Sequence, residues 1–165
     1  MKKMAKAAAL IAAMVLAAGL TACQGKGSSG GATVSAGLMF SNGLIYKGAE
    51  VAGYTYDVPA KLSIPKGVCG INENALYECL TLESVTIPDT VTYIGSDAFK
   101  GCKNLKSVNI PASVRLINYS FEDCESLKEV KYAGTKAQWE EIKKYSIGNF
   151  VVHCTDGDVT VGGEE

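Results

Sequence analysis

A unit of 22 or 23 residues recurs along the middle of the chain, between residues 61 and 132. The dipeptide Ile-Pro begins at residues 64, 87 and 110, at intervals of 23. Further columns keep this spacing: Cys79, Cys102 and Cys124; Leu82, Leu105 and Leu127; Val85, Val108 and Val130; Leu76, Phe99 and Phe121; Val68, Val91 and Val114; Ile71, Ile94 and Ile117. A unit this small cannot bury its apolar side alone. The columns therefore predict stacked coils, in which each column forms a ladder through a common core.

Each unit contains one segment with the pattern of a short strand. Val85-Thr86-Ile87 alternates in and out and is β-branched at all three positions, which favours a strand. Pro88 ends this strand, because proline cannot donate a hydrogen bond inside a sheet. Residues 97–100 are typical of a tight or helical turn that leads to the cysteine column. Strand, turn and return segment together have the length of a leucine-rich repeat.

The unit resembles the BspA-like leucine-rich repeats of bacterial surface proteins over roughly residues 61–132. The family motif, L-x-x-V-x-I-P and then I-x-x-x-A-F-x-x-C, is matched here by residues 82–88 and 94–102. The third unit departs from it, with Ser120 in place of alanine and one residue fewer near Asn118. The resemblance implies a mainly β solenoid of about three to four coils with short helical turns. It also implies adhesion or contact with a host or cell surface.

The ends of such a solenoid need caps, because an open end exposes core side chains and an unpaired strand edge. Residues 38–60, where aromatic and aliphatic side chains alternate with glycines, predict an N-terminal β cap. Residues 133–155 predict a C-terminal cap of helix and strand. We expect residues 156–165 to form a disordered acidic tail.

The predicted C-terminal cap has a recognisable helix start. Thr135 and Gln138 match a capping box, in which each side chain bonds the other residue's backbone N–H. The helix is expected to run to about Tyr145 and to place Trp139 and Ile142 on its buried side. A final strand follows, in which Phe150, Val152 and Cys154 alternate inward.

The N-terminus has the three parts of an export signal at residues 1–22. Lys2, Lys3 and Lys6 precede an uncharged stretch at residues 7–20, which is too short for a good membrane span. The sequence Leu-Thr-Ala-Cys at 20–23 resembles the lipobox of bacterial lipoproteins, which implies lipidation of Cys23. Residues 23–37 then read as a flexible Gly/Ser linker. These features predict an extracytoplasmic protein of the bacterial cell envelope, lipid-anchored to a membrane.

Charge argues against a nucleic-acid partner. Removing the three lysines of the signal leaves 13 basic and 17 acidic side chains, a formal net charge near −4. Arg115 is the only arginine, so phosphate binding by counterion release is not expected. We expect the protein to be a monomer without a cofactor.

The sequence contains no recognisable active site. His153 is the only histidine, and it adjoins Cys154 on a predicted strand, where neighbours point to opposite faces. The segment G-x-x-x-x-G-K does not occur, and neither does a C-x-x-C pair for zinc. We therefore predict no catalytic residue and no metal site.

The cysteines leave one question open. If Cys23 carries the lipid, five remain, and three of these share one inward column, so we predict buried free thiols at Cys79, Cys102 and Cys124. The sequence does not place Cys69 or Cys154, whose disulfide state stays open.

A binding face is the remaining candidate for function. The outward strand positions are Ser84, Thr86, Ser107, Asn109, Glu129 and Lys131. This strip lacks the Trp, Tyr and Arg of strong contact sites, so we expect weak or multivalent binding of a protein or other surface macromolecule. A merely solvated surface is the alternative, and Tyr77, Tyr93 and Tyr119 are other candidate contacts. A cell-envelope scaffold or assembly factor, and an accessory domain of an extracellular enzyme, also remain as functions.

Overall fold

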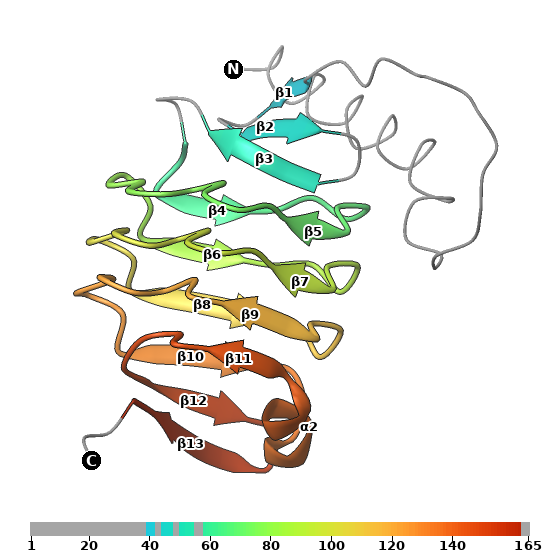
Figure 1. The fold of residues 1–165 in the computed structure, drawn as a ribbon, viewed down its shortest axis with the longest axis vertical. Coiled ribbons are helices and arrows are strands. Elements are labelled where there is room, and N and C mark those ends of the chain that lie inside the picture. The colour runs from blue at the N-terminus through green and yellow to red at the C-terminus, as the bar shows by residue number, and fades with distance from the viewer. Residues whose placement is uncertain (1–38, 42–43, 48–49, 55–57, 163–165) are drawn as a thin grey trace, which may run out of the picture.

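The computed structural model describes residues 39–41, 44–47, 50–54 and 58–162. These residues form two sheets that face each other, and the strands of each sheet follow one another along the length of the molecule (Figure 1). The six-stranded sheet has the order β13 (Gly157–Val161), β12 (Phe150–Cys154), β10 (Glu129–Tyr132), β8 (Ser107–Ile110), β6 (Ser84–Thr86) and β4 (Lys61–Ser63). The seven-stranded sheet has the order β1 (Met39–Ser41), β2 (Leu44–Lys47), β3 (Glu50–Tyr54), β5 (Gly70–Ile71), β7 (Tyr93–Ile94), β9 (Leu116–Asn118) and β11 (Lys143–Tyr145).

Successive coils of a solenoid each contribute one strand to each sheet. Coil one contains β4 and β5, coil two β6 and β7, coil three β8 and β9, and coil four β10 and β11. Pairing from β4 to β10 is parallel and in register, so Leu62, Val85, Val108 and Val130 lie in one row. The sequence predicts only one strand per coil. It misses β5 and β7 because a strand of two residues is too short to show a period.

The core lies between the two sheets and is built from the repeat columns. The side chains of Leu82, Leu105 and Leu127 are at most 2% exposed, and those of Val85, Val108 and Val130 are fully buried. In the aromatic column, Phe99 and Phe121 stack with ring centroids 5.3 Å apart. The stacked columns confirm the predicted ladder, and with it a mainly β leucine-rich-repeat solenoid.

The turns between the second strand of one coil and the first strand of the next also form a ladder. Leu76 N–H and Glu78 N–H of coil one donate to carbonyls of coil two, at residues 98 and 100, over 2.7 and 2.8 Å. Phe99 N–H and Gly101 N–H of coil two donate in the same way to coil three, at residues 120 and 122, over 3.0 and 2.9 Å. Each turn is therefore fixed by the turn that follows it.

Coil three is one residue shorter than coil two, and the difference in length falls within this turn. Ser120, which replaces the alanine of the motif, is fully buried. Its hydroxyl lies 2.9 Å from Gly95 O and 2.8 Å from Asn118 O, and it accepts a hydrogen bond from Asn118 N–H at 3.2 Å. The serine hydroxyl thus links backbone groups of coils two and three inside the shortened turn, and its own polar atom is satisfied where it is buried.

Ion pairs connect neighbouring turns at the surface. Three lysines of coil two contact glutamates of coils three and one: Lys100 with Glu122 at 3.0 Å, Lys103 with Glu125 at 3.0 Å and Lys106 with Glu83 at 3.1 Å. Such solvent-screened pairs contribute little to stability. Their main consequence is a charge pattern, in which a basic turn in coil two meets an acidic turn in coil three.

The N-terminal strands cap the seven-stranded sheet. β1, β2 and β3 pair antiparallel, and β3 then pairs parallel with β5 of coil one. Strands therefore occur in residues 38–60, where the sequence predicts them. Residues 1–38, which contain the predicted signal and linker, lie outside the described part of the chain. Within the described residues, no helix is long and apolar enough to cross a bilayer.

At the C-terminal end the capping box at Thr135 and Gln138 is confirmed, and it begins helix α2 (Lys136–Glu141). Trp139 and Ile142 are buried, as predicted, at 1% and 4% exposure. The helix ends earlier than predicted, because the chain turns into β11, which pairs parallel with β9. The predicted final strand forms as β12, with Phe150 and Val152 buried.

The predicted disordered tail is wrong over residues 157–161. These residues form β13, which pairs antiparallel with β12. Val159 and Val161 pack against the core, while Asp158 and Thr160 are exposed. The acidic composition of the tail hides this alternation of apolar and polar residues.

Candidate functional site

The outer face of the six-stranded sheet carries the six residues that the sequence singles out as a binding strip. Strand pairing arranges the outward side chains in two rows. The first row is Lys61, Ser84, Ser107, Glu129 and Val151, and the second is Ser63, Thr86, Asn109, Lys131 and His153. All ten are exposed or half-buried, whereas the residues between them are buried. The outward direction of the six follows the predicted alternation, and their role in binding stays a prediction.

The side chains of the two rows change from mostly uncharged to charged along the solenoid. Over coils one to three they consist mostly of hydroxyl and amide side chains, and Asn109 Nδ2 donates to Thr86 Oγ1 at 3.1 Å. Charged side chains follow on β10, where Glu129 and Lys131 are exposed. Rows spaced by about 4.8 Å, the distance between paired strands, offer regular hydrogen-bond donors and acceptors to a flat partner.

His153 ends the second row between two carboxylates from neighbouring strands. Its Nδ1 lies 2.9 Å from Asp158 Oδ1 on β13, and its Nε2 lies 3.7 Å from Glu129 Oε2 on β10. Cys154 faces the other way and packs against the core. The prediction that the side chains of His153 and Cys154 point to opposite faces of the strand is therefore confirmed. Sequence reasoning missed Asp158, because it lies in the segment expected to be disordered.

A shallow groove of about 310 Å³ runs along the edge of this face where the Ile-Pro dipeptides end the strands. Its lining combines the apolar side chains of Ile87, Ile110 and Pro111 with the polar side chains of Asn109 and Lys131. The binding strip predicted from the sequence does not include this groove. The repeated Ile-Pro is a signal for it, because Ile87 and Ile110 occupy the same repeat column and both line the groove.

The cysteine column is confirmed as three buried free thiols at Cys79, Cys102 and Cys124. The thiol of Cys102 donates to Leu76 O, and the thiol of Cys124 donates to Phe99 O, each at 3.1 Å. Burial raises the pKa of the Cys124 thiol to about 11, and burial also raises the pKa of Cys102. Protonated, buried thiols of this kind are packing groups and not nucleophiles. In the described part of the chain, no cluster of His, Cys, Asp or Glu could hold a metal ion.

The other candidate contacts separate into two kinds. Tyr77 and Tyr119 are exposed at the turns, at 40% and 42% of their surface, and Tyr119 stacks on Tyr145 with centroids 6.4 Å apart. Tyr93 is half-buried and lies over Gly70, where a Cβ would come within 2.1 Å of its ring. Its hydroxyl donates to Asn72 Oδ1 at 2.7 Å, so its role is structural. None of the three lies on the six-stranded sheet.

Comparison with known proteins supports this architecture. The model of the BspA type leucine rich repeat region matches residues 56–154 in six copies. The matched stretch extends beyond residues 61–132 and includes coil four, where both sheets continue. No curated protein matches the chain.

Two solved structures are similar to parts of the chain. A leucine rich repeat protein of T. pallidum is 25% identical, with a TM-score of 0.45 over 52% of this chain and 45% of the other. A leucine rich cell surface protein from Faecalibacterium prausnitzii A2-165 is 25% identical, with a TM-score of 0.30 over 57% of this chain and 38% of the other. This chain therefore matches less than half the length of either protein. Because the family model covers more than half of the chain and the stacked columns satisfy its pattern, the protein belongs to the BspA-type leucine-rich repeat family.

Proposed function

We propose that this protein is a bacterial surface protein that binds another macromolecule through the outer face of its six-stranded sheet. The observation that carries the proposal is the pair of outward rows, polar except for Val151, which cross five strands in register. A solenoid presents such a surface without any further element, because each coil repeats the same outward positions. The groove beside the second row adds an apolar anchor next to Asn109 and Lys131.

The chemistry of the face favours binding over catalysis. The thiols of Cys102 and Cys124 are buried and their pKa values are raised by that burial, which disfavours the reactive thiolate. His153 lies between the carboxylates of Asp158 and Glu129. The polar rows contain no Trp, Tyr or Arg, so one molecule is expected to bind weakly. Many copies on one cell would raise the overall affinity by multivalency. A protein on a host or bacterial surface is the partner we propose, with adhesion as the outcome.

Lipid anchoring through Cys23 belongs to the same proposal. A Gly/Ser linker at residues 23–37 would hold the solenoid away from the membrane and leave its outer face accessible. Several acyl chains on one residue would retain the protein far longer than a single chain can.

Replacing Cys23 with alanine tests this anchor. The variant is expected to lose incorporation of labelled fatty acid and to leave the membrane fraction, because no other thiol is presented after the lipobox. Cys154→Ala is the matched control, and it should keep both the label and the membrane location. Labelled fatty acid that still enters the Cys23 variant would contradict lipidation. Protease treatment of intact cells should remove the wild-type solenoid, whereas protection would favour an envelope scaffold.

Reversing one charge in the second row tests the binding face. Lys131→Glu should lower attachment of the full chain to a panel of immobilised extracellular-matrix proteins about tenfold, which corresponds to about 1.4 kcal/mol. Lys143→Glu makes the same change on an exposed strand of the opposite sheet and should leave attachment unchanged. An equal loss from both variants would assign the effect to net charge and not to this face. No attachment by the wild-type chain would contradict adhesion to the matrix.

A further inference from the structure

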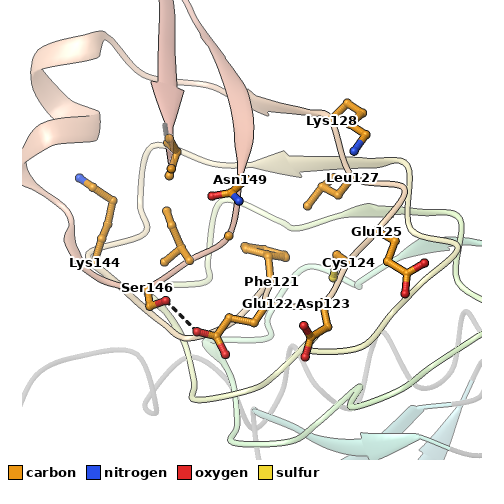
Figure 2. Close-up of a pocket in the computed structure, with 14 residues that line it drawn as sticks. Phe121, Glu122, Asp123, Cys124, Glu125, Leu127, Lys128, Lys144, Ser146 and Asn149 are labelled. Carbon is orange, nitrogen blue, oxygen red and sulfur yellow. Dashed lines mark hydrogen bonds between the residues drawn. The ribbon is translucent and has the colours of Figure 1, made fainter. Parts of the chain in front are cut away.

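A cavity of about 670 Å³ lies beside the turn of coil three, away from the outer face of the six-stranded sheet. The turn of coil three lines one side, and the loop at residues 146–149 with the end of β13 lines the other. Figure 2 shows Phe121 and Leu127 facing its interior, with the carboxylates of Asp123 and Glu125 at its edge. The side chains of Phe121 and Leu127 are each 2% exposed, so the floor of the cavity is apolar and well packed.

The cavity occupies the place where a fourth turn would stack. In coils one and two, at least two N–H groups of each turn donate to carbonyls of the following turn. In coil three, Tyr119 N–H still donates to Tyr145 O at 2.7 Å, but the chain then crosses directly to β12 through the short loop. Among the described residues, the N–H groups of Phe121 and Asp123 have no acceptor. These two positions correspond to Phe99 and Gly101, which both donate in coil two.

The open side of this turn is acidic. Glu125 and Asp123 are exposed, and Glu125 pairs with Lys103 of coil two on its inner side. Glu122 is already held by Lys100 and by Ser146, whose hydroxyl donates to it at 2.7 Å, and these hydrogen bonds lower its pKa.

The cations that line the cavity leave the acidic edge open. The ammonium group of Lys144 is directed to the carbonyls of Trp139 and Ile142 at the end of α2. Lys128, which is exposed, lies at the opposite end of the lining from Ser146 (Figure 2). Coil two meets the acidic turn of coil three with lysines, so a segment that continues the stack would need basic side chains.

We propose that this cavity binds an extended basic segment of a partner polypeptide, which takes the place of the missing fourth turn. Two carbonyls of the segment, two residues apart, accept from Phe121 N–H and Asp123 N–H, as carbonyls of coil three accept from coil two. Lysine or arginine side chains of the segment meet Asp123 and Glu125. An apolar side chain between them rests on Phe121 and Leu127. This contact is separate from the outer face and goes beyond the function proposed above.

Peptide binding to the full chain tests the proposal. The probe is an acetylated, amidated eight-residue peptide in which lysine and valine alternate, and its counterpart has glutamate in place of lysine. The basic peptide should bind and the acidic one should not. The double variant Asp123→Asn with Glu125→Gln should weaken binding at least tenfold. Glu83→Gln is the matched control, because Glu83 pairs with Lys106 as Glu125 pairs with Lys103, and it should have no effect.

Amide hydrogen exchange gives a second readout that non-specific charge attraction would not move. The amides of Phe121 and Asp123 should become protected when the basic peptide is bound. Unchanged exchange at both amides, equal binding of the acidic peptide, no binding, or no loss in the double variant would each overturn the proposal. Lys131→Glu, which tests the outer face, should leave peptide binding intact, so the two proposals fail separately.

Discussion

Replacing Trp139 with alanine is expected to lower the free energy of unfolding by about 3–5 kcal/mol, the range for a large aromatic side chain lost from a core. Trp139 is 1% exposed and closes the core at the end of the solenoid. Its ring packs edge-on against Tyr132, with centroids 5.2 Å apart, and the ammonium group of Lys144 lies 5.2 Å above its face. Alanine removes the ring and leaves a cavity between α2 and β10. Urea denaturation of the full chain, followed by circular dichroism, measures the loss.

A neighbouring exposed position provides the control for Trp139. Glu141 lies on the same helix and is exposed, so Glu141→Ala should change the free energy by no more than about 0.5 kcal/mol. Because coils contact only their neighbours, the tryptophan variant should also lose amide protection first in β11 and β12. A loss of less than 1 kcal/mol in the Trp139 variant would mean that α2 does not close the core.

Leu105→Ala is expected to cost about 2–5 kcal/mol, because leucine buried in a core leaves a cavity that the surroundings fill only partly. Leu105 is fully buried in coil two, between Leu82 and Leu127 in the same column. The variant therefore removes contacts to the coils on both sides. The same urea titration measures it, with folding checked by the retained far-ultraviolet spectrum.

Lys106, the next residue, gives a matched control for Leu105. Its side chain is 64% exposed and pairs with Glu83, so Lys106→Ala should cost no more than about 1 kcal/mol. If Leu105→Ala changed stability by less than about 0.5 kcal/mol, the assignment of this column to the core would be wrong.

The repeat columns made the core predictable from the sequence, because a ladder places every member of a column in the same environment. Leu105 and Val108 are buried, and Asn109 is not, as the spacing and alternation predict. The capping box at Thr135 and Gln138 was predictable for a different reason. It depends on residues three apart in the chain and not on distant contacts.

Features that depend on where the pattern stops were not predictable. β13 pairs with β12 through a turn at Thr155 and Asp156, and the acidic composition of this segment is typical of a solvated tail. The cavity beside Phe121 exists because coil four crosses to β12 without a full turn, and no residue type marks that absence. Both features depend on contacts between segments that are not equivalent positions of the repeat. The spacing of the repeat columns does not predict such contacts.

Ser120 shows how a repeat protein can grow from copies of unequal length. One buried hydroxyl bonds backbone groups of two coils where a residue is missing, so the shorter copy is accommodated inside a single turn. Val108 and Val130, on either side of that turn, still pair in register. Selection can therefore act on one duplicated unit at a time, and a length error in one copy does not have to be matched in its neighbours.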